Sequence, residues 1–119
     1  MAEHDTIDRA ALDDLLATMG GDSAFLAELI DTYFEDSESL LPAMRQALAS
    51  GSADELRRAA HSLKSNSASF GAQELAVLCR ELEEQGRAGT LRGASERLAQ
   101  VEAEYERVRR ALQAARPTA

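Results

Sequence analysis

The sequence has little of what disulfide-bonded, metal-clustered, membrane-spanning or β-sheet proteins require. One cysteine among 119 residues excludes an intramolecular disulfide, a cysteine-rich structural zinc site and an iron–sulfur cluster. The longest unbroken apolar run, residues 75–79, is far shorter than the roughly 20 residues that a membrane-spanning helix needs. Three valines and two isoleucines are too few strand-forming residues for a β-sandwich, a barrel or a doubly wound sheet.

Alanine and leucine, which favour helices, fill 23 and 16 positions instead. A chain of this length forms one domain and can bury a core of its own. The first residues, 1–5, are acidic where a signal peptide would be basic and then apolar. We therefore expect a single all-α domain located in the cytoplasm.

Charge is spread unevenly along the chain. The net charge of −8 argues against a nucleic-acid partner, because phosphates would repel the protein. Residues 1–50 carry 11 acidic and 2 basic side chains, whereas residues 51–70 carry 2 acidic and 3 basic ones. The one basic stretch contains His61 and the only lysine, Lys64.

Apolar spacing and turn residues divide the chain into five helical segments. They cover approximately residues 8–19, 22–50, 53–69, 72–85 and 91–116. Pro42 should bend the second segment near residues 38–41 without ending it. Gly71 should reverse the chain after the third segment, and Gly86 and Gly89 should bracket the turn before the fifth.

Short connections between long helices imply antiparallel neighbours. The sequence thus predicts an antiparallel up-down four-helix bundle with a short additional N-terminal helix. The domain spans residues 1–119, with residues 1–7 as a flexible leader and residues 116–119 as a flexible tail.

His61 lies on the outer face of the third helical segment. Its angle on the helix is about 150° from the centre of the apolar stripe, so it should face solvent. Its neighbours on the helix surface are cations and small residues: Arg57, Arg58, Lys64, Ser65 and Ala68. Neutral imidazole is a nucleophile near pH 7, cations would stabilise an added phosphoryl group, and small neighbours would let a partner approach. The alternative is an exposed histidine without a role.

Residues 61–83 read HSLKSNSASFGAQELAVLCRELE. The segment resembles the histidine-containing phosphotransfer (HPt) domains of bacterial phosphorelays, whose pattern is H-x-L-K-G-x(5)-G-A-x-x-L-x-x-x-C-x-x-L-E. The resemblance implies that His61 is phosphorylated, that Lys64 assists electrostatically and that Gly71 shapes the hairpin. Ser65 replaces the usual glycine; it is still small, so docking should survive. Cys79 lies on the apolar face and is expected to be part of the core.

The resemblance implies a monomeric phosphorelay intermediate with no kinase activity, cofactor or metal of its own. Its partners would be response-regulator receiver domains, which supply Mg²⁺, and a sensor or hybrid histidine kinase. Arg57, Arg58, Ser65 and Ala68 would form the docking face. No membrane or nucleic acid would be bound.

Two other functions stay open from the sequence. A helical adaptor could bind receiver domains without transferring phosphate, and phosphorylation of His61 distinguishes it from a phosphotransfer protein. The dimerisation and phosphoacceptor segment of a histidine kinase would normally have an acidic residue directly after the histidine. Ser62 occupies that position, and the chain has no room for an ATP-binding domain.

Overall fold

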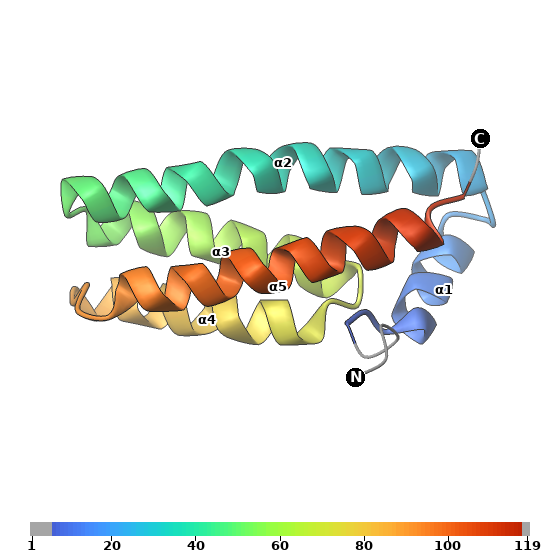
Figure 1. Cartoon of the computed structure of the whole chain (residues 1–119). Helices are drawn as coiled ribbons and strands as arrows, with labels where there is room; N and C mark the ends of the chain where they lie inside the picture. Colours follow the sequence, from blue (N-terminus) through green and yellow to red (C-terminus); the bar gives the residue numbers. More distant parts are fainter. Residues whose placement is uncertain (1–5, 118–119) are drawn as a thin grey trace.

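A computed structural model of the protein describes residues 6–117, which form five α-helices and no strand (Figure 1). The helices are α1 (Arg9–Thr18), α2 (Ser23–Ser50), α3 (Ala53–Ser69), α4 (Gln73–Ala88) and α5 (Ala94–Ala115). The predicted all-α class is confirmed.

Four long helices run side by side, and α1 lies across one end of them (Figure 1). Along the chain each long helix packs against the next, and α5 closes the bundle by contacting α2. The short helix α1 contacts α3. This is the predicted antiparallel four-helix bundle with an additional N-terminal helix.

Ser52 caps the start of α3. The Ser52 side chain accepts a hydrogen bond from the backbone N–H of Glu55, at 3.2 Å. This bond satisfies one of the N–H groups that a helix leaves free at its start. Gly51, directly before it, ends α2 in the left-handed conformation that a glycine adopts without a Cβ penalty. The chain therefore turns from α2 into α3 within two residues.

Two predicted details of the later helices are wrong. Gly86 was expected in the turn after the fourth helix, but it is buried inside α4, which continues to Ala88. Gly89 alone ends α4, in the left-handed conformation. The last helix begins at Ala94, not at Leu91. Gly93, directly before it, has a left-handed backbone conformation that does not fit within an α-helix. In contrast, α2 runs past Pro42 without a break, as predicted.

The expected leader and tail are in part packed against the bundle. Thr6 and Ile7 were placed in the flexible leader, but both side chains are buried. Arg116 was placed in the tail, yet its guanidinium donates two hydrogen bonds to the Asp31 carboxylate, at 2.7 and 2.9 Å. The rest of the expected leader (1–5) and tail (118–119) lies outside the described residues, and the bend expected at Pro42 stays a prediction.

The core runs the length of the bundle and is mainly aliphatic. Its fully buried side chains come from α2 to α5 and include Ile30, Met44, Leu63, Leu82 and Leu98. One polar contact crosses it, between the Tyr33 hydroxyl and Ser67 Oγ at 2.8 Å. Each hydroxyl thereby meets the hydrogen-bonding need of the other in a site without water access. No helix within residues 6–117 is long and apolar enough to span a membrane.

Candidate functional site

His61 projects from the outer face of α3, as the helix pattern predicts. Its side chain is 56% exposed, while Ala60 and Leu63, on the opposite side of the helix, are fully buried. The amphipathic pattern of α3 therefore fixes which way the imidazole faces.

A buried carboxylate from α4 holds the imidazole ring. Glu83 Oε2 lies 2.8 Å from His61 Nδ1, and the Glu83 side chain is only 4% exposed. The same carboxylate forms ion pairs with two cations. Lys64 Nζ lies 2.6 Å from Oε1, and an Arg87 guanidinium nitrogen lies 3.2 Å from Oε2.

Glu83 is ionised in this setting. Burial opposes its charge and would raise the pKa, but hydrogen bonds and charge attraction from Lys64 and His61 outweigh burial and hold the pKa below its ordinary value. An ionised carboxylate only accepts hydrogen bonds, so Nδ1 of the ring must be the donor. In the neutral ring the other nitrogen, Nε2, then carries the lone pair. The nitrogen that does not contact Glu83 is therefore the nucleophilic one.

On the α4 side of the ring the charges leave a positive surplus, whereas the Asp36 carboxylate borders the hollow on the α2 side. Lys64 and Arg87 bring two positive charges to the single negative charge of Glu83. A phosphoryl group on Nε2 would bring further negative charge, which this surplus favours. The arrangement thus accommodates an anionic group on the ring better than a neutral one.

The other two predicted cations are engaged elsewhere. Arg57 and Arg58 both form ion pairs with Asp54, each at 2.9 Å. These are pairs across one helical turn, at spacings of three and four residues. Asp54 therefore neutralises part of the positive charge that the two arginines bring to this face of α3, and their role in docking stays a prediction.

Serine side chains lie beside His61 on the side facing α2. Ser65 and Ala68 are exposed on α3. Ser65 borders an open hollow between α2 and α3 that also includes His61 and Asp36. A serine in the place of the usual glycine therefore leaves the ring accessible from this side.

Two glycines set the position of α3 relative to its neighbours. A Cβ on Gly86 would lie 2.7 Å from the Ala53 carbonyl oxygen and 2.9 Å from the Arg57 nitrogen, so α4 approaches the start of α3 at backbone distance. Gly71 has a φ of +78°, and a Cβ there would lie 2.7 Å from the Asp8 carbonyl oxygen. The predicted turn at Gly71 is confirmed, with the start of α1 packed against it.

Cys79 is part of the core, as predicted. Its side chain is fully buried. Burial, with the negative charge of Glu83 adding to it, raises the pKa of the thiol to about 12. The sulfur is therefore protonated and takes no part in the chemistry at His61.

Glu83 and Arg87 were not predicted to lie at His61, and Gly86 was expected in a turn. Glu83 was the last letter of the quoted pattern, but nothing in the sequence shows that a residue 22 positions later contacts His61. Within residues 6–117 there is no group of three or more His, Cys, Asp or Glu side chains able to hold a metal ion.

Comparisons with known proteins identify the family of the chain. The model of the Hpt domain family matches residues 28–111. Histidine-containing phosphotransfer protein 2 of Arabidopsis thaliana is 32% identical over 96 residues, which cover 78% of this chain and 62% of that protein. The chain thus spans less than two thirds of this curated relative. The crystal structure of histidine-containing phosphotransfer protein B from Pseudomonas aeruginosa PAO1 matches with a TM-score of 0.86 and 37% identity, over 93% of this chain and 94% of that one.

Proposed function

The chain belongs to the Hpt domain family, and we propose that it is a phosphorelay intermediate that carries a phosphoryl group on His61. One observation supports this most strongly. His61 Nδ1 lies 2.8 Å from the buried carboxylate of Glu83, and the His61 side chain is 56% exposed.

The transfer step needs no reactant other than this chain and the phosphorylated receiver domain. Nε2 of the neutral ring attacks the phosphorus of an aspartyl phosphate on a receiver domain. The N–P bond forms as the P–O bond to the aspartate breaks, and the aspartate carboxylate leaves with the electron pair. The reverse step returns the group to another receiver.

The surrounding side chains stabilise charge as the N–P bond forms. The ring becomes positively charged when Nε2 bonds to phosphorus, because Nδ1 keeps its proton. Glu83, in contact with Nδ1, stabilises that positive charge. Lys64, whose ammonium contacts the other oxygen of the same carboxylate, attracts the incoming phosphoryl oxygens. No proton has to move.

The partners we propose are receiver domains and a sensor or hybrid histidine kinase. The receiver supplies the acidic phosphorylation site and its Mg²⁺, and this chain contributes the imidazole and the local charges. It therefore acts as a carrier without kinase activity or a metal of its own. We further propose that it works as a monomer in the cytoplasm.

A phosphotransfer assay tests the proposal. Receiver domains encoded in the same genome are labelled with radioactive phosphate and mixed with the chain. Wild type should gain an acid-labile, alkali-stable label, and His61→Gln should gain none while keeping its helical circular dichroism. Binding of receivers without any label on wild type would favour the adaptor function, and a label on His61→Gln would place the phosphate elsewhere.

A further inference from the structure

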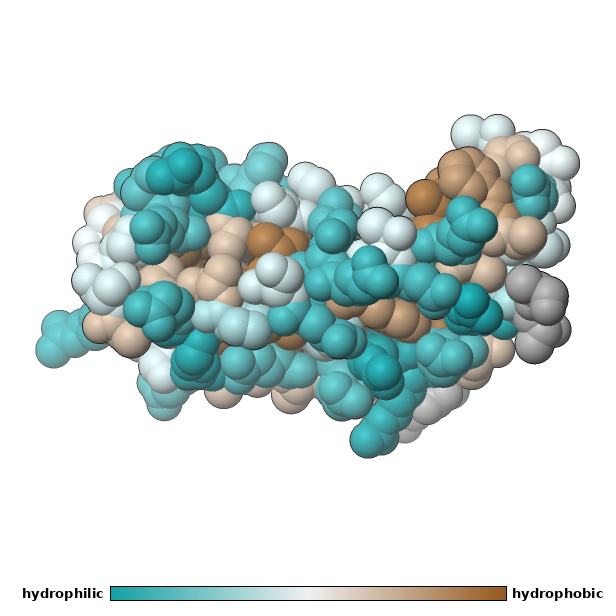
Figure 2. Space-filling view, turned by 90° about the horizontal axis from the view of Figure 1, so that it is seen from above, coloured by the Kyte–Doolittle hydropathy of each residue, from teal (hydrophilic) through white to brown (hydrophobic). Residues whose placement is uncertain are grey.

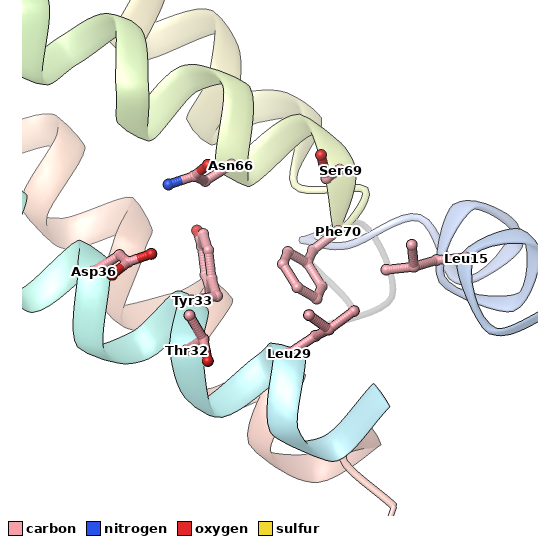
Figure 3. A pocket seen from close by; sticks show the side chains of 8 residues that line it. All are labelled: Leu15, Leu29, Thr32, Tyr33, Asp36, Asn66, Ser69 and Phe70. Atoms are coloured by element: carbon pink, nitrogen blue, oxygen red, sulfur yellow. The ribbon is translucent and has the colours of Figure 1, made fainter. Parts of the chain in front are cut away.

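An apolar depression lies next to the hollow beside His61, where α1, α2 and α3 meet. Three apolar side chains border it, one from each of the three helices or its end: Leu15, Leu29 and Phe70. Figure 3 shows the three side chains directed toward one another, with Tyr33 beside them. In the space-filling view, apolar side chains gather at the end of the molecule that carries α1 (Figure 2).

Two polar side chains join this depression to the hollow at His61. Asp36 of α2 and Asn66 of α3 border both. Figure 3 places them at the end of the depression away from Leu15. A continuous groove therefore runs between α2 and α3, apolar near α1 and polar near His61.

Within residues 6–117, three carboxylates of α2 have no cation beside them, Glu28, Glu35 and Asp36, and of these only Asp36 borders the groove. Asp31 forms an ion pair with Arg116, and Glu38 forms one with Arg109. The exposed Asp36 side chain forms neither an ion pair nor a hydrogen bond within the described part of the chain. It thus keeps its charge available to a partner, at the edge of an apolar surface.

We infer that Asp36 selects the receiver partner by pairing with a lysine or arginine on a receiver helix that lies in this groove. The inference rests on the proposed function and names the chemistry of its partner surface. A helix that places an apolar side chain and a cation one turn apart matches an apolar depression followed by a carboxylate. The surplus of acidic groups in residues 1–50 attracts the same basic surface over a longer range.

The test compares two charge reversals on α2. Asp36→Lys changes the groove, whereas Glu35→Lys changes an equally exposed neighbour that does not border it. Each variant is labelled by a phosphorylated receiver that labels wild type, and separately by phosphoramidate, a small phosphoryl donor that needs no docking surface. For Asp36→Lys, the receiver concentration at half-maximal rate should rise about tenfold relative to Glu35→Lys. In Asp36→Lys, the rate of labelling by the receiver divided by the rate of labelling by phosphoramidate should fall by a similar factor.

A charge exchange completes the test. Reversing the cation on the receiver helix should weaken transfer to wild type and restore transfer to Asp36→Lys. Equal behaviour of Asp36→Lys and Glu35→Lys would overturn the inference and leave the proposed function intact. If no receiver labels wild type, while receivers still bind it, the proposed function fails and this inference fails with it.

Discussion

At the scale of single residues, Glu83 determines what His61 can do. A lone exposed histidine could react through either ring nitrogen. The carboxylate on Nδ1 leaves Nε2 as the available nucleophile and stabilises the charge that the ring acquires. The Glu83 side chain is only 4% exposed, so its hydrogen bond with His61 is shielded from water. The low local dielectric makes that bond stronger than it would be in water.

Lys64 should accelerate transfer without being indispensable. Its ammonium is partly exposed and shared with Glu83, so solvent and salt reduce its effect to about 1 kcal/mol. We expect Lys64→Ala to stay folded and to transfer phosphate about tenfold more slowly. Lys64→Arg should recover part of the rate, because the charge matters more than its shape. Rapid-quench time courses at two ionic strengths measure this, and an Ala variant as fast as wild type at low salt would contradict it.

Glu83 should make the stability of the fold depend on pH in acid. Its pKa is lower in the folded protein than its ordinary value of 4.5, so its charge stabilises the fold above about pH 4.5. That contribution is lost as the pH falls through the lower, folded-state value. The difference in unfolding free energy between wild type and Glu83→Gln should therefore be largest near neutral pH and shrink below pH 4.5. Urea unfolding at several pH values measures it, and a constant difference would disprove the assignment.

At the scale of elements, the site depends on the contact between α3 and α4. His61 and Glu83 belong to different helices, and only the spacing and register of those helices bring them together. Gly86 lies one turn after Glu83 and lets the two backbones approach. The glycine is therefore part of the geometry of the site, although it does not touch the ring.

Gly86→Ala should separate the two helices slightly. The gain in helix propensity, about 1 kcal/mol, is smaller than the cost of forcing a methyl group against the Ala53 backbone, up to about 3 kcal/mol. The melting temperature should fall by roughly 5 °C, and transfer should slow about tenfold because the Glu83 contact lengthens.

Gly89→Ala is the matched control for this change. Its φ is +78°, but a Cβ there meets nothing within 4 Å. It should lower the melting temperature through backbone strain alone and leave transfer near the wild-type rate. If calorimetry and transfer assays give the same result for both variants, the helix spacing does not control the site.

The helices themselves were largely predictable from local signals. Gly71 carried a turn signal, Ser52 is of a residue type that commonly caps the start of a helix, and the apolar stripe of α3 gave the direction of His61. The role of Gly86 was not predictable, because a glycine that allows close helix packing looks in sequence like one that ends a helix. The pairing of Arg57 and Arg58 with Asp54 was available from their spacing, whereas the contact of Glu83 with His61 requires the folded bundle.

At the scale of the whole molecule, a preformed bundle carries the site on its surface. The ion pairs Arg45–Glu102 and Arg109–Glu38 connect α2 with α5, on helices other than those that hold His61 and Glu83. Exposed pairs of this kind contribute little each. Stability therefore rests mainly on the aliphatic core, to which the buried Glu83 carboxylate and its partners add.

Cys79 can report the opening of this core. The thiol is fully buried, and its pKa is raised to about 12 by burial and by Glu83. Alkylation by iodoacetamide at pH 8 should be at least about 10³-fold slower in the native protein than in the urea-unfolded chain. Mass spectrometry during a urea series should show labelling rise together with the loss of helical circular dichroism. Rapid labelling of the native protein would mean that the bundle opens locally at α4.

The central claim is that His61 carries the phosphoryl group on Nε2 because Glu83 holds Nδ1. Phosphorus–nitrogen NMR couplings on the ¹⁵N-labelled, receiver-phosphorylated protein measure this directly. The predicted result is one phosphohistidine, with the phosphorus coupled to His61 Nε2 and the proton retained on Nδ1. A coupling to Nδ1, or a phosphate on any other residue, would contradict the account.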